Sequence, residues 1–315
     1  MNIVLTDYET IDHDPRFFQR FEAYGPLTLY DTTSDDEAAP RLRDAEAVLC
    51  NKTNLTADVL KQCPRLRYIG LFATGYNNID IQQASAQGIT VCNAGRYSTQ
   101  AVAQHTFALM LECFGCISTY RRFTESGSWQ KCRVFSPILC TTHELYGRTL
   151  GIVGYGNIGK AVARIGRAFG MRLLVHTRTP GADPSVTYVS LPRLLEESDV
   201  ISLHCPLTDQ NQRMLGREQF RQCRRRPLLI NTARGGLIDE AALAEALREG
   251  WLSGAALDTL TKEPMAKDCP LIGAPNLLLT PHVAWAARET IDRLVGIVED
   301  NLSAFLSGRP QNQVG

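Results

Sequence analysis

The sequence has no excess of charge of either sign and no long apolar run. Lysine and arginine together number 33, as do aspartate and glutamate, so the net charge is zero. A neutral chain is a poor candidate for non-specific binding to nucleic acid. Because no apolar run approaches the roughly 18–20 residues of a membrane helix, we also expect no membrane partner. The start, Met1–Asp7, lacks a basic segment before a long apolar one, so we interpret it as a strand and not as a signal peptide.

The remaining composition is that of a folded protein with a small partner. Apolar residues make up 44% of the 315 residues, which is ample for buried cores and excludes wholesale disorder. A domain usually holds about 100–200 residues, so two domains are expected.

The ten cysteines are dispersed through apolar segments. Only Cys113 and Cys116 form a C-x-x-C pair, inside the apolar stretch Ala101–Cys116, which predicts a buried helix. A redox pair would need an exposed helix N-terminus, and a zinc site would need a second pair of ligands nearby. We therefore interpret the cysteines as reduced core thiols, and expect no metal and a cytoplasmic location.

Short, fully apolar segments alternate with helical patterns along the chain. The predicted strands are Ile3–Leu5, Ala47–Leu49, Tyr68–Leu71 and Thr90–Cys92, then Leu150–Val153, Arg172–Val175, Val200–Leu203, Leu228–Asn231, Gly254–Leu257 and Leu277–Leu279. The helical patterns include Ala57–Gln62, Ile81–Gln87, Gln100–Cys116, Ile158–Phe169, Asp239–Arg248 and an amphipathic C-terminal segment, Glu289–Leu306. This alternation predicts an α/β fold with two parallel sheets covered on both faces, divided near residue 100.

A glycine motif follows the strand at Leu150–Val153 and opens the next helix. It has the form G-x-G-x-x-G, with Gly154, Gly156 and Gly159. In this context the first glycine permits a tight turn, the second lets the backbone approach a pyrophosphate, and the third allows close packing of helix and strand. The helix N-terminus then presents free N–H groups to the phosphates. The motif therefore predicts a dinucleotide site, the alternative being a glycine-rich turn without a ligand.

The end of the next strand bears on the choice of cofactor. A site for NAD usually places an acid there to accept from the ribose hydroxyls. Here Thr177, Arg178 and Thr179 follow His176, and no carboxylate is present. A hydroxyl and a guanidinium suit a 2′-phosphate better, so we expect NADP(H) to be used at least as well as NAD(H). The alternative is that Arg178 is only a solvent-facing loop residue.

Three polar residues stand just beyond predicted strand ends. They are Arg234, Glu263 and His282, within Asn231–Gly236, Thr261–Pro264 and Thr280–Trp285. Ligands of open parallel sheets bind at the carboxyl ends of the strands. Each residue taken singly has an alternative role in capping or in a loop, but with a dinucleotide site they form a candidate catalytic set.

With these motifs in place, the chain resembles the D-isomer-specific 2-hydroxyacid dehydrogenase family over nearly its whole length. The segments that carry the resemblance are Gly154–Gly159, His204–Thr208, Asn231–Gly236, Leu257-Asp258, Glu263-Pro264 and Pro281-His282. Within the family it looks closest to the glycerate dehydrogenase (hydroxypyruvate reductase) branch, through Asn51–Thr53, Ala73–Asn77, Tyr97–Thr99 and His282–Trp285.

The resemblance implies a reduction of a small 2-keto acid by hydride transfer from a nicotinamide cofactor. Arg234 would bind the carboxylate and the carbonyl oxygen, as a planar guanidinium can. His282 would donate a proton to the carbonyl oxygen, or accept one in the reverse direction. Glu263 would hold the second ring nitrogen of His282 and fix its orientation.

The resemblance also assigns binding residues to each ligand. The residues expected to bind the dinucleotide are Thr106, Gly154, Tyr155, Gly156, Asn157, Ile158, Gly159, Thr177, Arg178, Thr179, Cys205, Pro206, Thr208, Arg213, Thr232, Ala233, Arg234, Asp258, His282 and Ala284. Those expected to bind the substrate are Asn51, Lys52, Ala73, Thr74, Gly75, Arg234, His282 and Trp285. The loop Ala73–Gly75 would use its backbone N–H groups for the substrate carboxylate.

The implied architecture is two Rossmann-like, doubly wound domains with an active-site cleft between them. Residues 1–99 with 286–315 would form a discontinuous substrate-binding domain, and residues 100–285 the dinucleotide-binding domain. Closure of such a cleft implies hinges near 98–100 and 285–288. Family members are commonly dimers through the cofactor domain, so a homodimer is expected, with Ala101–Cys116 and Arg133–Cys140 as the candidate interface.

One departure from the branch bears on the substrate. Many hydroxypyruvate reductases have a tryptophan before the position of Gly147, but here the segment is Arg133–Cys140, without one. Trp129 lies earlier and is interpreted as a helix tryptophan that packs. The pocket is therefore open to substrates other than hydroxypyruvate, glyoxylate included. Two further functions remain as alternatives, namely a dinucleotide-sensing corepressor or scaffold of the same fold and a dehydrogenase of formate or phosphite.

Overall fold

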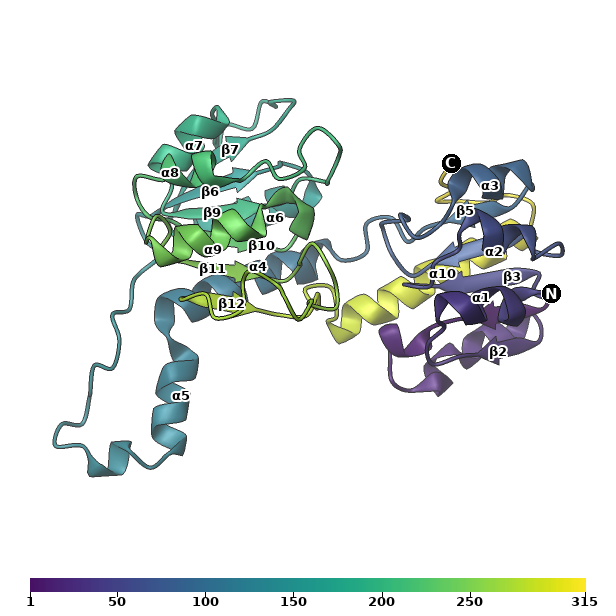
Figure 1. Ribbon diagram of the computed structural model, residues 1–315, viewed down its shortest axis with the longest axis horizontal. Helices are drawn as coiled ribbons and strands as arrows, with labels where there is room; N and C mark the ends of the chain where they lie inside the picture. Colours follow the sequence, from purple (N-terminus) through teal and green to yellow (C-terminus); the bar gives the residue numbers. More distant parts are fainter. The chain divides into compact units, whose positions relative to one another are not determined.

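The computed structural model describes all 315 residues, which divide into two compact units (Figure 1). The split unit consists of Met1–Ser98 and Ala286–Gly315, and the central unit of Thr99–Trp285. The chain therefore passes between the units twice, after Ser98 and after Trp285.

The split unit is built on a five-stranded sheet in which all strands are parallel. The strand order is β2-β1-β3-β4-β5, with β1 at Ile3–Leu5, β2 at Leu27–Leu29, β3 at Ala47–Cys50, β4 at Tyr68–Leu71 and β5 at Thr90–Cys92. Its helices are α1 (Asp35–Leu42), α2 (Ala57–Lys61), α3 (Ile81–Ala86) and α10 (Arg288–Leu306), with 3-10 helices at Tyr8–Thr10 and Pro15–Tyr24.

The C-terminal helix α10 belongs to this first sheet although it follows the whole central unit in the sequence. It packs against β4 and β5 and buries Leu294, Val298 and Leu302 completely. These positions recur at helical spacing, as the amphipathic pattern predicts. A separate core joins α1, α2 and α3 to the strands, so the sheet is shielded on both faces.

The central unit is built on a seven-stranded sheet, also entirely parallel. The strand order is β12-β11-β10-β9-β6-β7-β8, with β6 at Thr149–Val153, β7 at Arg172–His176, β8 at Thr187–Tyr188, β9 at Val200–Leu203, β10 at Leu228–Asn231, β11 at Gly254–Leu257 and β12 at Leu277–Leu279. Its helices are α4 (Thr99–Gly115), α5 (Ile117–Glu125), α6 (Asn157–Ala168), α7 (Leu191–Glu197), α8 (Arg217–Arg221) and α9 (Glu240–Arg248), with 3-10 helices at Trp129–Lys131 and Gly235–Leu237.

Two apolar cores cover the two faces of this sheet, and the strand β10 contributes to both. Leu228 and Ile230 pack in the core that contains α4 and α6. Leu229, between them, packs in the core that contains α7, α8 and α9. Successive strand residues point to opposite faces, so a strand buried on both sides must be apolar at every position.

Each strand order contains a point at which the chain changes direction across the sheet. In the split unit this point lies between β1 and β3, and in the central unit between β6 and β9. The carboxyl ends of the strands on either side of such a point leave a crevice in which ligands of α/β proteins bind. The fold therefore specifies two places for binding residues before any side chain is considered.

The predicted fold class, two parallel α/β sheets covered by helices, is confirmed. The prediction missed β2 and β8, which are edge strands with the sequences LTL and TY; neither is a continuous apolar run and neither is fully buried. It also placed Cys116 inside a buried helix, and that is wrong. Helix α4 ends at Gly115, and Cys116 has a positive φ of 52° and is partly exposed.

Beyond this break the chain forms an excursion, residues 116–142, which we call the arm. It contains α5 and the 3-10 helix Trp129–Lys131, and Figure 1 shows it extending away from the sheet of the central unit and returning. No single helix in the chain is long and apolar enough to cross a membrane, although α4 and α5, which meet at a bend of 63°, pass that test as a pair.

Candidate active site

Residues predicted to bind the cofactor follow the carboxyl ends of strands in the central unit. In chain order, Gly154 follows β6, Thr177 follows β7, Cys205 comes just after β9, Thr232 follows β10, Asp258 follows β11 and His282 comes just after β12. Because all these strands are parallel neighbours, the residues gather at one edge of one sheet. Gly154 and Cys205 flank the point where the strand order reverses.

The glycine motif connects β6 to α6 through a turn that only glycine fits. Gly154 has a φ of +94°, and a Cβ there would lie 2.5 Å from the backbone nitrogen of Cys205. A Cβ on Gly159 would lie 2.2 Å from the carbonyl oxygen of Gly154. Both contacts are too short for any side chain, so the turn and the helix pack directly on backbone.

The second glycine of the motif, Gly156, has a different environment. A Cβ there would meet no atom within 4 Å, and Gly156 is the N-cap of α6, with no side chain bonded to the helix N-terminus. The first residues of α6, Asn157 and Ile158, therefore present backbone N–H groups to an open space. These features fit a dinucleotide pyrophosphate, which binds at such helix N-termini.

The loop after β7 is tied to the glycine motif by a pair that the sequence did not indicate. The hydroxyl of Tyr155, inside the motif, donates to the Asp183 carboxylate at 2.7 Å. Ser185 also donates to Asp183, through its backbone N–H and its hydroxyl. These hydrogen bonds lower the pKa of Asp183 to about 2. An acid thus follows β7 after all, seven residues past His176, but its oxygens are engaged by Tyr155 and Ser185.

The residues at the predicted ribose position stand at the start of this loop. Thr177 is half-buried, whereas Arg178 and Thr179 are exposed. Arg178 lies close enough to Cys205 to favour its thiolate, although burial is the larger effect and raises the pKa of Cys205. The guanidinium is therefore near the turn of the glycine motif, where a cofactor phosphate would be expected.

The segment after β9 contains a histidine that remains neutral. Nε2 of His204 shares a hydrogen bond of 2.8 Å with the Ser202 hydroxyl, and Nδ1 is shielded from solvent without a partner. Burial lowers the pKa of His204 to about 3. His204 is accordingly unsuited to proton donation near neutral pH.

The next turn is organised by Asn211, a residue that no sequence motif indicated. The Asn211 side chain accepts from the backbone N–H of Thr208 at 2.7 Å and donates to the carbonyl of Pro206 at 2.7 Å. Arg213 follows with a φ of +52°, and its N–H donates to the carbonyl of Gly236 at 2.7 Å. The predicted cofactor residues of this segment are thereby joined to the loop that carries Arg234.

Arg234 lies beyond β10, in a loop held by its neighbours. Asn231 is buried, and its amide donates to the Arg234 carbonyl at 2.9 Å while accepting from the Ala233 N–H at 3.0 Å. The Arg234 side chain is exposed, with Nη1 donating to the Ala233 carbonyl. The backbone is therefore fixed while the guanidinium reaches solvent, as an anion-binding arginine requires.

Thr106 and Thr232 form a buried pair behind this loop. Their hydroxyl oxygens are 3.1 Å apart, and Thr106 also donates to the Val102 carbonyl of its own helix, α4. Thr106 is completely buried. Its observed role is to fix Thr232 at the end of β10, and a direct contact with the cofactor stays a prediction.

His282 and Glu263 form the central contact of the candidate site. Nδ1 of His282 lies 2.7 Å from Oε2 of Glu263. The other oxygen of Glu263 accepts from the backbone N–H of Leu260 at 2.9 Å, which fixes the carboxylate. The indole N–H of Trp285 donates to the His282 carbonyl at 3.0 Å. Because Nδ1 is bonded to Glu263, Nε2 is the ring nitrogen of His282 that can bind a substrate.

The loop that carries His282 is shaped by the buried carboxylate of Asp258. This carboxylate accepts from the backbone N–H groups of Val283 and Ala284, each at 2.9 Å, and from the Thr280 hydroxyl at 2.5 Å. His282 itself has a φ of +56°, in the left-handed region. Asp258 therefore holds the strained turn that places the histidine, and Ala284 is anchored by the same group.

In the split unit, the predicted substrate residues Asn51 and Lys52 lie in a turn built on a second buried carboxylate, Asp7. The backbone N–H groups of Asn51, Lys52 and Thr53 all donate to Asp7, at 2.6–2.9 Å for the shortest bond of each. The Asn51 side chain is buried and donates to Thr10, whereas Lys52 is exposed. Of this pair, Lys52 is therefore the one whose side chain reaches solvent.

The loop Ala73–Gly75 follows β4, the neighbour of β3. The Thr74 hydroxyl donates to the Gly95 carbonyl at 2.5 Å, and the Thr74 carbonyl accepts from the Asn93 amide at 2.7 Å. The Ala73 carbonyl accepts from the Ala94 N–H at 2.9 Å. These bonds hold the loop through its carbonyls and the Thr74 hydroxyl. This is consistent with the prediction that the backbone N–H groups of the loop bind the substrate carboxylate.

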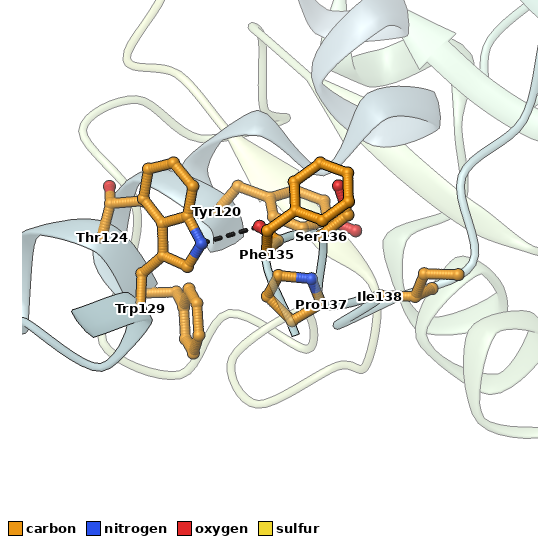
Figure 2. Close-up of a pocket in the computed structure, with 8 residues that line it drawn as sticks. Tyr120, Thr124, Trp129, Phe135, Ser136, Pro137 and Ile138 are labelled. Atoms are coloured by element: carbon orange, nitrogen blue, oxygen red, sulfur yellow. Dashed lines mark hydrogen bonds between the residues drawn. The ribbon is translucent and has the colours of Figure 1, made fainter. Parts of the chain in front are cut away.

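Trp129, in the arm, is more exposed than the sequence predicted. The residue lies in a 3-10 helix and is 51% exposed, so its interpretation as a packed helix tryptophan is wrong. Its indole N–H donates to the Phe135 carbonyl at 2.8 Å, and together with Pro137 these residues line a pocket of about 390 Å³ (Figure 2). The pocket is formed entirely by residues of the arm.

Comparison with known proteins places the chain in a family. Residues 107–284 match the model of the D-isomer specific 2-hydroxyacid dehydrogenase, NAD binding domain. The chain is 40% identical to a glycerate dehydrogenase of Methylorubrum extorquens, with 99% of this chain and 98% of that protein aligned. This chain therefore belongs to the D-isomer specific 2-hydroxyacid dehydrogenase family.

Solved structures agree with the assignment. The TT0316 protein of Thermus thermophilus superposes with a TM-score of 0.90 at 35% identity, covering 100% of both chains. An NADPH-dependent glyoxylate/hydroxypyruvate reductase of Sinorhizobium meliloti, solved with NADP and malonate, superposes with a TM-score of 0.86 at 29% identity, covering 100% of this chain and 96% of that one.

The enclosed His204 predicts a pH dependence of stability. Its pKa of about 3 lies below the 6.5 of a free histidine, so the unfolded chain binds the proton more readily and stability falls as the pH drops below 6.5. At pH 5 the loss from this residue is at most about 2 kcal/mol relative to pH 7.5. His204→Asn should therefore lose less stability over this range in urea unfolding, whereas His13→Asn, at an exposed position, should match the wild type. Equal losses in His204→Asn and the wild type would contradict the assignment.

Proposed function

We propose that this chain reduces a small 2-keto acid of the glyoxylate or hydroxypyruvate kind to the D-2-hydroxy acid, with a nicotinamide dinucleotide as hydride donor. The observation that carries the proposal is the 2.7 Å contact between His282 and Glu263, placed at the same sheet edge as the exposed Arg234 and the glycine motif. Family membership supports the same reaction.

The chemistry divides among three side chains. Arg234 binds the substrate carboxylate and carbonyl oxygen through its planar guanidinium. His282 donates a proton from Nε2 to the carbonyl oxygen as the alcohol forms, and takes it back in the reverse direction. Glu263 accepts from Nδ1, which keeps Nε2 aimed at the substrate. The bound dinucleotide supplies the hydride.

Further substrate contacts are proposed from other loops. Backbone N–H groups of Ala73–Gly75 would bind the carboxylate together with Arg234, and Asn51, Lys52 and Trp285 would contact the remainder of a small acid. The names of the relatives, glycerate dehydrogenase and glyoxylate/hydroxypyruvate reductase, support a two- or three-carbon substrate.

We propose NADP(H) as a cofactor at least as good as NAD(H). Arg178 and the hydroxyls of Thr177 and Thr179 are suited to a 2′-phosphate. The acid that follows in the same loop, Asp183, is bonded to Tyr155 and Ser185 and so is not available to replace the missing ribose acceptor. A structural neighbour solved with NADP supports the same preference.

We also propose a homodimer through the central unit, and a cytoplasmic location. The arm exposes apolar side chains that monomers rarely leave in a group, with Phe135 86% and Ile138 89% exposed. The ten free cysteines support a reducing compartment, and recovery of the chain outside the cytoplasm on cell fractionation would contradict it.

The reaction is tested by a panel of 2-keto acids, with formate and phosphite included, assayed with NADPH and NADH. We expect reduction of glyoxylate or hydroxypyruvate with the highest kcat/KM, and a kcat/KM for NADPH at least equal to that for NADH. Arg178→Ala should lower the NADPH value by about 10-fold or more while changing the NADH value by less than about threefold, because only the 2′-phosphate loses a charged partner. Arg193→Ala, on the surface of α7, is the matched control.

Other outcomes of this panel would favour a different function or a different cofactor. Dinucleotide binding without reduction of any 2-keto acid would favour the corepressor or scaffold. Oxidation of formate or phosphite alone would favour that kind of dehydrogenase. A large preference for NADH in the wild type would overturn the cofactor proposal without affecting the reaction.

The dimer is tested by sedimentation. The wild type should sediment with twice the mass of one chain, and Phe135→Ser combined with Ile138→Ser should shift it to one chain, since both substitutions place polar groups in an apolar interface. Ile272→Ser, at an apolar residue 54% exposed outside the arm, should leave the dimer intact. A wild-type monomer, or a double variant that stays dimeric, would reject this interface.

A further inference from the structure

His105, a residue of α4 that the proposed reaction does not use, lies against the loop that carries His282. Its Nε2 is 3.0 Å from the hydroxyl oxygen of Thr280 and 3.5 Å from Oδ1 of Asp258. The Asp258 side chain is completely buried, whereas 22% of the His105 side chain is exposed. All four residues belong to the central unit. A second histidine therefore adjoins the carboxylate that shapes the turn at His282.

Helix α4 brings the imidazole to this place because the helix packs against β10 and β11. Thr106, the next residue of α4, contacts Thr232 at the end of β10, and His105 contacts Thr280, just after β12. Asp258 follows β11, which lies between β10 and β12 in the sheet. Two successive residues of α4 thus contact the loops on either side of Asp258.

The hydroxyl of Thr280 determines which group on the His105 ring carries a hydrogen. A threonine hydroxyl has a single hydrogen, and Thr280 donates it to Oδ1 of Asp258 at 2.5 Å. The Thr280 oxygen can then only accept from His105, so Nε2 must carry a hydrogen. The bonds form a directed chain that runs from the His105 N–H through the Thr280 hydroxyl to the Asp258 carboxylate.

The chain ends on the atoms that hold the turn at His282. Oδ1 of Asp258, which accepts from Thr280, also accepts from the backbone N–H of Val283 at 2.9 Å. The backbone carbonyl of Asp258 accepts from the His282 N–H at 2.8 Å. His105 is therefore connected, through two successive hydrogen bonds, to the carboxylate that stabilises the left-handed backbone of His282.

Packing alone does not account for a histidine at this position of α4. Ala101, Val102 and Leu109, which lie one turn away along the helix, are all buried. An apolar side chain would fill the position without a hydrogen-bond partner, whereas an imidazole largely removed from water needs one. The residue is therefore better explained by the donor that it supplies to Thr280.

We propose that His105 is a positioning residue for the reduction. Its Nε2–H, acting through the Thr280 hydroxyl, fixes the Asp258 carboxylate and thereby the turn that aims His282 at the substrate. The inference rests on the proposed function, because His282 is the residue that transfers the proton there. His105 transfers no proton and binds neither ligand, so its loss should change the rate of the chemical step and leave binding nearly unchanged.

The first test is steady-state kinetics with the best 2-keto acid. His105→Leu, which removes the donor, should lower kcat by about 10-fold to 100-fold, because a displacement of about 1 Å in a reacting group can cost that much. His105→Gln, whose amide N–H can donate to Thr280 instead, should keep kcat within about threefold of the wild type. In both variants KM for the keto acid and Kd for the dinucleotide should change by less than about threefold.

His13→Leu makes the same substitution at an exposed position of the split unit and should turn over like the wild type. A His105→Leu protein with wild-type kcat would overturn the proposal. So would a loss of kcat that His105→Gln shares in full, because the glutamine restores the donor.

A second variant interrupts the same chain at its middle. Thr280→Val removes the hydroxyl between His105 and Asp258 and nearly keeps the shape of the side chain. It should lower kcat as His105→Leu does, and the double variant should be no slower than the slower single variant, since both substitutions break one chain. Losses that multiply in the double variant would overturn the proposed route. Thr280→Val alone tests the chain if His105→Leu fails to fold.

The hydrogen on Nε2 is tested without turnover, by NMR of protein isotopically labelled in its histidine nitrogens. The resonances of His105, identified by their absence from His105→Gln, should show a hydrogen on Nε2, and a bare Nε2 would contradict the chain. A wild type that reduces no 2-keto acid would overturn the proposed function and the positioning role together. An active wild type whose His105→Leu and Thr280→Val variants are equally active would overturn only the positioning role.

Discussion

The histidine of this site works only if its ring keeps one orientation, and two carboxylates impose it. Asp258, buried at the end of β11, accepts hydrogen bonds from two successive backbone N–H groups and a hydroxyl of the loop after β12. These bonds stabilise a turn in which His282 has a left-handed backbone that would otherwise be strained. Glu263, fixed by the Leu260 N–H, then bonds the ring. Catalysis as proposed depends on this chain of contacts.

In the split unit, too, a buried carboxylate fixes a loop by accepting hydrogen bonds from its backbone. Asp7, buried beyond the end of β1, accepts from three successive N–H groups of the turn after β3. In each unit a parallel sheet brings several loops to one edge, and a buried carboxylate shapes the loop that presents functional side chains. A carboxylate bonded by several N–H groups is a strong, directional anchor. The loops can therefore be positioned accurately although they lie outside regular secondary structure.

The sequence predicts the parts of this arrangement that depend on local patterns. Buried strands of four or five apolar residues, the glycine turn at Gly154 and the amphipathic helix α10 each have a signature of fixed spacing. The family resemblance also implied a Glu263–His282 pair, and Nδ1 of His282 and Oε2 of Glu263 lie 2.7 Å apart. Asp7 and Asp183 could not be predicted, because they bond to Asn51 and Tyr155, which lie 44 and 28 residues away, and no sequence pattern links residues at those separations. The break at Cys116 was missed because apolar residues continue on both sides of it.

The central claim, that His282 transfers the proton, is tested most directly by the turnover of His282→Ala with the best 2-keto acid, alongside its affinity for the dinucleotide. The account predicts that kcat falls by about 100-fold to 10,000-fold, the usual contribution of a general acid, while dinucleotide affinity stays nearly unchanged. His13→Ala, at an exposed position in the split unit, should retain wild-type turnover. A His282→Ala protein that turns over like the wild type would contradict the account.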